Sequence, residues 1–211
     1  MKKIAVIDLM FRWPPDGGAR VEVKEVFARL ATRYKVKLFA PRIDSITKRG
    51  VIEGDLGFEV ETIPFDVKNF KGPHVEASFK KAIDAFKPDL VFIADGFYHK
   101  PWIARAVKDY PYFLKFYAYE NLCHRNNGTF MRGNRSCYRT GLAAPLIDQV
   151  YCIVCGMRHL VRCARYGYKE FLPEYFGASA WSLRQWTRTQ QMLDGAREIL
   201  VYNTMVQAML Q

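Results

Sequence analysis

Glycines and charged or aromatic residues follow several apolar runs of this sequence, at points where a strand would end. The run from Lys3 to Phe11 is apolar and rich in β-branched residues, which predicts a buried strand leading to Gly17 and Gly18. Glycine permits positive φ angles and a close backbone approach, so this pair predicts a tight turn from strand to helix. The N-terminus of that helix would aim free N–H groups at the turn, where an anion or a sugar hydroxyl could bind.

A purely structural turn explains the same glycines. The dinucleotide fingerprint Gly-x-Gly-x-x-Gly is absent, and only the pair Gly17-Gly18 is present, so the sequence gives weak support to generic nucleotide binding. Glycine's backbone freedom accounts for such a pair without any ligand. Both interpretations stay open for this motif taken alone.

A second group of candidates follows later apolar runs. The run from Leu90 to Ala94 predicts a central parallel strand, and ligands of open α/β sheets bind beyond the carboxyl ends of strands. The imidazole of His99 titrates near neutrality and is a candidate catalyst, although a lone histidine at a helix start is also an ordinary surface residue. The residues that this argument places in the same layer as the glycine turn are Asp95, Gly96, Tyr98, His99 and Glu120.

Four of the five cysteines could form a metal site. Cys152 and Cys155 have the Cys-x-x-Cys spacing of half a zinc knuckle, and Cys123 and Cys137 would complete a tetrahedral site. Four thiolates leave no open coordination position, so such a zinc ion would be structural. Free thiols of a reduced protein, or a disulfide formed on purification, are the alternatives.

The charge of the chain is strongly positive and unevenly spread. The 211 residues contain 32 lysines and arginines against 21 acidic residues, and residues 115–169 hold nine basic residues but only Glu120 and Asp148 as acids. This excess favours phosphates, acidic lipid headgroups or nucleic acid as partners, or else forms a solvated basic surface. No apolar run reaches the roughly 18 residues of a membrane helix, and no convincing secretion signal follows Met1. We therefore expect a cytoplasmic protein that could associate peripherally with the inner face of an anionic membrane.

Strands and helices alternate along most of the chain. Strands are expected at residues 3–11, 35–40, 58–63, 90–94, 112–119 and 197–203, and helices at 18–33, 74–86, 102–108, 181–193 and 204–210. This order predicts an α/β, Rossmann-like, doubly wound parallel sheet in a single domain covering residues 1–211. Acidic and apolar residues alternate in the third strand, which places it near a sheet edge. Residues from about 121 to 196 break the alternation and predict a cysteine- and arginine-rich insertion.

Four segments carry a likeness to a known family. They are Pro14-Pro-Asp-Gly-Gly-Ala-Arg20 with its helix, Lys87-Pro-Asp-Leu-Val-Phe92, the strand ending at Glu120 with its cysteines, and Ala196-Arg-Glu-Ile-Leu-Val-Tyr-Asn-Thr204. In order and spacing they resemble the N-terminal half of a GT-B glycosyltransferase of the large retaining family 4. The family commonly has a histidine followed by an acid before the cysteines, where this chain has Tyr117-Ala-Tyr119-Glu120, so we assign no general base.

The resemblance implies an enzyme that transfers a hexose from a nucleotide sugar to a glycan or a lipid-linked acceptor. Such enzymes hold the donor in a separate C-terminal domain, which these 211 residues lack, so we expect an acceptor-binding domain that is inactive alone. No catalytic cofactor is implied, which leaves structural zinc as the candidate metal. The candidate catalytic residues are Glu120 and His99, and the candidate substrate-binding residues are Gly17, Gly18, Arg20, Asp95, Tyr98 and Tyr119.

Two other functions stay open. A metal-stabilised nucleic-acid-binding module would use the basic segment from Arg125 to Arg165. Nucleic acid is disfavoured because no recognition helix or RNA-binding motif is present and a doubly wound sheet would be unexplained. A non-catalytic glycan-binding module would share the fold of the acceptor-binding domain.

Overall fold

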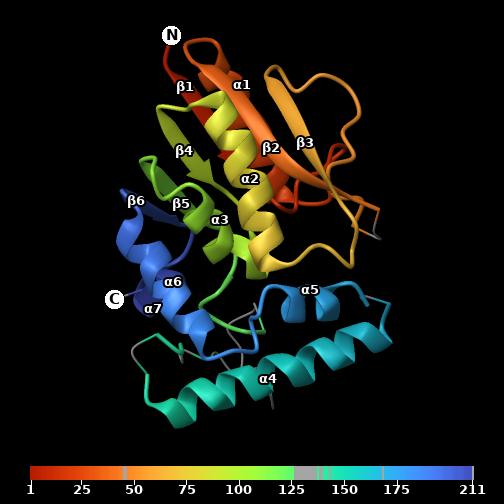
Figure 1. Ribbon diagram of the computed structural model, residues 1–211, viewed down its shortest axis with the longest axis vertical. Helices are drawn as coiled ribbons and strands as arrows, with labels where there is room; N and C mark the ends of the chain where they lie inside the picture. Colours follow the sequence, from red (N-terminus) through yellow and green to blue (C-terminus); the bar gives the residue numbers. More distant parts are fainter. Residues whose placement is uncertain (45–46, 126–136, 138–139, 143, 168, 211) are drawn as a thin grey trace.

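The strands form one parallel sheet. The computed structural model describes residues 1–44, 47–125, 137, 140–142, 144–167 and 169–210. Within them, the strands are β1 (Lys3–Ile7), β2 (Lys35–Ile43), β3 (Glu59–Phe65), β4 (Leu90–Ile93), β5 (Tyr112–Phe116) and β6 (Glu198–Val201). Their order is β3-β2-β1-β4-β5-β6, and all neighbours are parallel (Figure 1). This is the strand order of Rossmann folds, which confirms the predicted α/β doubly wound sheet.

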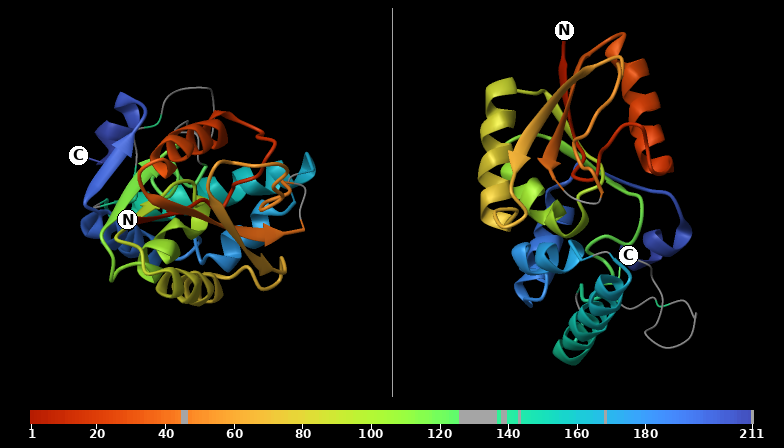
Figure 2. Two further views of the ribbon diagram at one scale, coloured as in Figure 1. Left: turned by 90° about the horizontal axis from the view of Figure 1, so that it is seen from above. Right: turned by 90° about the vertical axis from the view of Figure 1, so that its right-hand side faces the viewer.

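Helices cover both faces of the sheet. They are α1 (Gly18–Ala31), α2 (Gly72–Phe86), α3 (Lys100–Ala106), α4 (Leu146–Arg165), α5 (Phe171–Gly177), α6 (Arg184–Gly195) and α7 (Thr204–Leu210), with a 3-10 turn η1 (Phe97–His99). Helix α1 lies on one face, and α2 and α3 lie on the other (Figure 2). None of the helices in the described ranges is long and apolar enough to span a bilayer.

The pleat of β1 explains why its whole sequence is apolar. Ala5 and Ile7 belong to the core on the α2 side, whereas Ile4 and Val6 belong to the core on the α1 side. Successive side chains of a strand point to opposite faces, so a strand covered on both faces must be apolar at every position. The predicted central position of β4 is confirmed, and β1, predicted as a buried strand, lies beside it.

Helix α2 shows how the sequence sets the limits of an element. It begins with Pro73 in its first turn, where the missing N–H costs nothing, and buries Val75, Phe79 and Ile83 at helical spacing. It ends at Lys87, which has a φ of 54° and precedes a proline. These three apolar side chains pack α2 against the sheet.

Strand β2 continues past the point at which the sequence predicted its end. Pro41 lies inside β2, opposite Ile63 of β3. The pairing of β2 with β1 stops at Phe39, so at the proline β2 has a neighbour on one side only. A missing N–H is tolerated there because no strand of the sheet pairs with that edge of β2 beyond Phe39.

Strand β3 forms an edge of the sheet, as predicted. Glu59 and Glu61 lie 3.1 and 2.6 Å from the ammonium groups of Lys35 and Lys37 on β2. Pro64 lies near the end of the strand. The outermost strand is therefore held to the sheet by cross-strand ion pairs as well as by its ladder.

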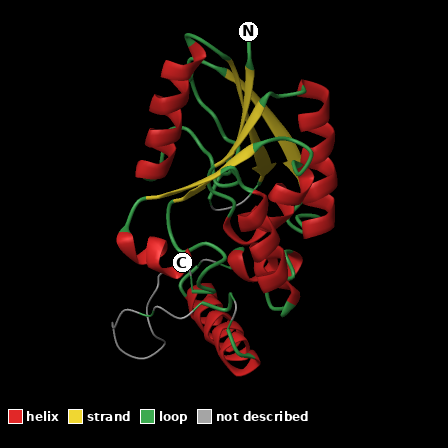
Figure 3. Ribbon diagram, turned by 90° about the vertical axis from the view of Figure 1, so that its left-hand side faces the viewer, coloured by secondary structure: helices red, strands yellow, loops and turns green. Residues whose placement is uncertain are grey.

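Most of the structure between β5 and α6 was not predicted from the sequence. Helices α4 and α5 were not predicted, and β1 and β5 end at Ile7 and Phe116, earlier than the apolar runs suggested. Both new helices lie beyond the carboxyl ends of the strands (Figure 1), and α4 is the helix farthest from the sheet (Figure 3). Helix α6 returns to the sheet, where the Tyr112 hydroxyl donates a hydrogen bond to the carbonyl of Met192 at 2.7 Å.

Candidate functional site

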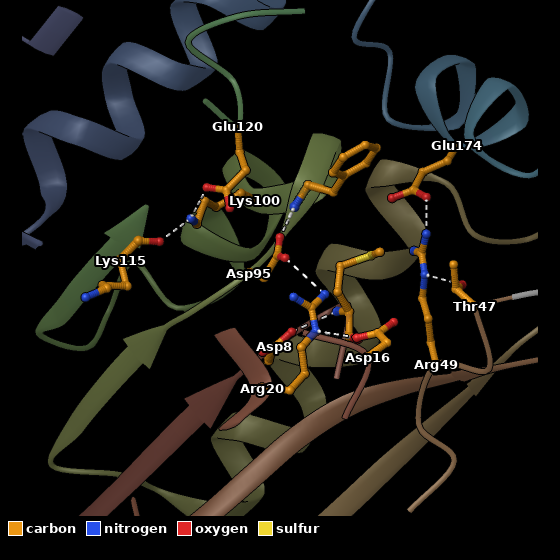
Figure 4. A network of polar contacts seen from close by, with 12 residues as sticks. Asp8, Asp16, Arg20, Thr47, Arg49, Asp95, Lys100, Lys115, Glu120 and Glu174 are labelled. Atoms are coloured by element: carbon orange, nitrogen blue, oxygen red, sulfur yellow. Dashed lines mark hydrogen bonds and ion pairs between the residues drawn. The ribbon is translucent and has the colours of Figure 1, made fainter. Parts of the chain in front are cut away.

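Charged side chains gather at the carboxyl ends of β1, β4 and β5 (Figure 4). Asp8, Asp95 and Glu120 follow these strands and are all buried. The backbone N–H of Leu9 donates to the carbonyl of Asp95 at 2.6 Å, which joins the first two loops. The strand order reverses between β1 and β4, and such a point is where ligands of open α/β sheets bind.

Arg20, in the first turn of α1, holds these loops together. Its Nη2 lies 3.1 Å from Oδ2 of Asp95, and its Nε donates to the Met10 carbonyl at 3.2 Å. Asp16 approaches the same Nε at 3.6 Å. Burial alone lowers the pKa of Arg20, but the carboxylates of Asp8 and Asp95 more than offset this and raise it. The guanidinium therefore stays charged among carboxylates.

Asp8 is only partly satisfied. Its Oδ1 accepts a hydrogen bond from the N–H of Met10 at 2.8 Å, whereas Oδ2 has no hydrogen-bond partner within the described residues. Burial raises the pKa of Asp8 to about 7, with Arg20 opposing this shift and Asp95 adding to it. Such a buried oxygen stays unsatisfied unless the carboxyl is protonated or a water molecule or ligand hydroxyl reaches it.

A second buried pair lies beside the first. The ammonium of Lys100 is 2.8 Å from Oε2 of Glu120 and also donates to the Lys115 carbonyl. Burial raises the pKa of Glu120 to about 7, against the opposing effect of Lys100. Gly96 allows this packing, because a Cβ there would lie 2.7 Å from the Cβ of Lys100. Asp95 also raises the pKa of Glu120, so the two pairs influence each other.

Gly17 and Gly18 lie at the start of α1, next to this charged cluster. The predicted positive φ angles are wrong: Gly17 is extended, with a φ of −175°, and Gly18 is the first residue of the helix. Both are exposed, and a Cβ at either position would meet no atom within 4 Å. The fold therefore tolerates side chains at both positions. Of the features predicted for this glycine pair, the structure keeps the open space beside the N-terminus of α1.

His99 belongs to a different buried cluster. Its Nδ1 lies 3.5 Å from Oε1 of Glu174, whose other oxygen pairs with Arg49 at 2.7 Å. The ring packs against Phe70 with the centroids 4.4 Å apart. Burial works to raise the pKa of Glu174, yet Arg49 and His99 together lower it to about 2. This cluster joins the loop after β2 to α5, away from Arg20.

The two candidate tyrosines are also engaged elsewhere. The Tyr98 hydroxyl donates to the His124 carbonyl at 3.1 Å, and its ring packs edge-on against Tyr175. The Tyr119 hydroxyl lies 3.3 Å from the sulfur of Met205. The structure therefore joins Arg20, Asp95 and Glu120 in one charged region but directs His99 and Tyr98 into the core beneath α5.

The predicted zinc ligands lie near one another. A Cβ at Gly156 of α4 would be 2.5 Å from the Cβ of His124, so α4 crosses the segment after β5 in close contact. Burial, followed by the thiols of Cys123, Cys137 and Cys155, raises the pKa of Cys152 to about 12.

These thiols do not form a ready metal site. All five cysteines are free, and no three His, Cys, Asp or Glu side chains in the described part of the chain are arranged to hold a metal ion. Zinc binding stays a prediction. Arg132, Arg135 and Arg139, part of the basic segment between these cysteines, lie outside the described residues.

Asp8, Lys100, Arg49 and Glu174 were not identified as site or network residues from the sequence. Asp8 had a usable signal, because it is an acidic residue inside the otherwise apolar run from Lys3 to Phe11. No sequence signal marked the buried pairs of Lys100 with Glu120 and of Arg49 with Glu174, because the two members of each pair lie 20 and 125 residues apart in the sequence.

Fold and site together define a Rossmann-like α/β protein with a charged cluster at the point where its strand order reverses. Comparison with known proteins extends this no further: no family model matches the chain, and no curated protein is significantly similar to it.

Proposed function

We propose that this chain is the acceptor-binding domain of a GT-B hexosyltransferase, which transfers a hexose from a nucleotide sugar to a glycan or lipid-linked acceptor. One observation carries the proposal: the open space at Gly17 and Gly18 lies beside the cluster formed by Arg20, Asp95 and Asp8. The four segments that resemble family 4 add support, since they include the glycine pair and the strand before Glu120.

The charges of the cluster favour sugar hydroxyls over phosphate as its ligand. The guanidinium of Arg20 already lies among Asp8, Asp16 and Asp95, so little positive charge is left for an anion. Carboxylate oxygens accept hydrogen bonds from hydroxyl groups, and Asp8 has an oxygen without a partner in the described residues. Helix α1 begins without a side-chain cap, so the N–H groups of Gly18 and Ala19 are available as donors, whereas that of Arg20 already donates to the Gly17 carbonyl.

Catalysis in this proposal is positional and electrostatic. The domain would orient an acceptor hydroxyl toward the anomeric carbon of a donor held by a separate domain or subunit, with no catalytic cofactor. Glu120 is paired with Lys100 and His99 is fully buried, so the proposal gives neither the role of general base. The chain alone would bind acceptor without transferring sugar.

The test uses the protein encoded by the complete gene and a panel of nucleotide hexoses. We expect release of nucleoside diphosphate that depends on an added glycan or lipid-linked acceptor. Gly18→Trp should reduce this release about 100-fold, because the indole would fill the open space and displace the acceptor. Its unfolding temperature should stay that of the wild type.

Val26→Trp is the matched control, since Val26 lies on the same helix and is exposed. It should leave the release of nucleoside diphosphate unchanged. Acceptor-dependent release that persists in Gly18→Trp would refute the site, and a wild-type protein inactive with every nucleotide hexose would refute the reaction.

A further inference from the structure

Helix α4 turns an apolar surface outward. In its first half, the exposed apolar side chains have between 38 and 75 % of their surface accessible; they are Leu146, Ile147, Val150, Tyr151 and Val154. Cys155, Gly156 and Leu160 are buried on the opposite side of the helix. A helix that packs on a protein core normally buries its apolar stripe, so this surface is fitted to contact something else.

The second half of the same surface is basic. Arg158, Arg162 and Arg165 are exposed at the positions that continue the spacing of the apolar residues, with the exposed Val161 among them. Asp148 is the one acidic residue of α4. We call this surface, apolar from Leu146 to Val154 and basic from Arg158 to Arg165, the α4 face.

The α4 face lies at one end of the molecule. Figures 1 and 3 show α4 beyond the carboxyl ends of the strands, and α5 lies between α4 and α2 in Figure 1. The charged cluster of Asp8, Arg20 and Asp95 lies at the carboxyl ends of the same strands. A surface that contacts the α4 face would therefore be on the side of the molecule where the strands end.

We infer that the α4 face docks on an anionic lipid bilayer, with Ile147 and Val150 entering the boundary between headgroups and acyl chains. Helices that combine a basic region with exposed large apolar side chains lie in the plane of the membrane interface. The arginines would contact headgroup phosphates, and the net charge of +11 draws the whole protein to a negative surface.

Charge disfavours a second copy of the chain as the occupant. In a parallel pair of α4 helices, the arginines of both copies would meet. In an antiparallel pair, the apolar half of one helix would lie against the basic half of the other. A bilayer offers apolar and anionic groups within one surface and matches both halves. The inference does not depend on the proposed hexosyl transfer, because it rests on the α4 face and on the net charge of the chain.

Sedimentation with lipid vesicles tests this inference. The protein should bind vesicles of phosphatidylcholine mixed with phosphatidylglycerol, and added salt should weaken the binding. Ile147→Glu/Val150→Glu should lower the affinity at least about tenfold by removing apolar contact area. Arg162→Gln/Arg165→Gln should lower it about fivefold per arginine, and only on vesicles that contain phosphatidylglycerol.

The control is Val21→Glu/Val26→Glu, which changes two valines of α1 that are as exposed as Val150. It should bind like the wild type, and thermal unfolding should show that every variant is folded. Val154→Ser, with a smaller loss of affinity, replaces the double variant if that fails to fold.

Three results would overturn the inference. The first is a wild-type protein that does not bind vesicles containing phosphatidylglycerol. The second is equal binding by the wild type and by folded α4 variants. The third is a dimer in sedimentation without lipid that Ile147→Glu/Val150→Glu dissociates while vesicle binding persists, which would make the α4 face a contact between copies. None of these readouts uses hexosyl transfer, so they separate this inference from the proposed function.

Discussion

Asp8 carries a fully buried carboxyl group, and burial disfavours its charged form. Its pKa is about 7 in the folded chain, above the usual aspartate value, because burial penalises the charged form. The folded state therefore binds more protons than the unfolded state between about pH 4 and pH 7. The contribution of Asp8 to stability is full below this interval and is lost as the pH rises through it.

Replacing Asp8 by asparagine should remove this dependence. The amide oxygen can still accept the hydrogen bond from Met10, and no charge is buried at high pH. We expect Asp8→Asn to raise the free energy of unfolding near pH 8 by about 1–3 kcal/mol relative to the wild type. The gain should vanish below about pH 3, where the wild-type carboxyl is protonated in both the folded and the unfolded state.

Urea titrations of wild type and variant across this pH range measure the difference directly. A difference that grows as the pH falls would mean that Asp8 is stabilised as a carboxylate by Arg20, against the effect of burial.

At the scale of elements, the crossing of α4 over the segment after β5 depends on Gly156. A Cβ at this position would lie 2.5 Å from the Cβ of His124, a distance that real Cβ atoms do not reach. Gly156→Ala should therefore push α4 outward and lower the free energy of unfolding by about 1–3 kcal/mol.

Gly18→Ala provides the contrast for this prediction. Gly18 opens α1 and has free space around its Cβ position, so alanine should be neutral or slightly stabilising, within about 0.5 kcal/mol. Chemical denaturation of both variants gives the comparison. Equal effects of the two substitutions would show that α4 does not approach His124 closely.

The elements also show why the sequence predicted the sheet but not α4. Strands covered on both faces are apolar throughout, and Gly, Pro and Asp residues mark their ends, so local patterns suffice for β1 and β4. Helix α4 directs Ile147 and Val150 outward and buries Cys155 and Gly156. Such a helix lacks the buried apolar stripe by which a helix is predicted from its sequence.

The site residues show the same difference between what local sequence patterns predict and what tertiary packing determines. The strand ends placed Asp95 and Glu120 correctly at the carboxyl edge of the sheet, because parallel strands end together. The partners of these residues are set by tertiary packing: Lys100 reaches Glu120 only because α3 starts beside Gly96. His99, one position earlier, is turned toward Glu174 instead. No local spacing distinguishes these two directions.

At the scale of the whole molecule, the cysteines would tie the insertion to the sheet if they bind zinc. Cys123 follows β5, whereas Cys152 and Cys155 lie on α4. The prediction is close to one equivalent of zinc per purified chain, bound with Cys137 as the fourth ligand. Cys155→Ser should then lose the zinc and lower the unfolding temperature by several degrees.

Metal analysis and thermal unfolding test this prediction, with Cys163→Ser as the control. Cys163 lies on the same helix, 3.4 Å from His159, and is not among the four proposed ligands. A zinc-free wild type, together with an unchanged unfolding temperature in Cys155→Ser, would leave these residues as free thiols.

The free edge of β3 affects how the molecule behaves at high concentration. An exposed strand edge is a template on which a second chain can continue the sheet, and this is the first step toward aggregation. Pro64 has no N–H to offer such a chain, and the side chains of Glu59 and Glu61 are held in ion pairs with Lys35 and Lys37 of β2. A second chain that adds to β3 would lack a complete ladder at Pro64. The β3 edge should therefore resist fibril formation even when the protein is crowded.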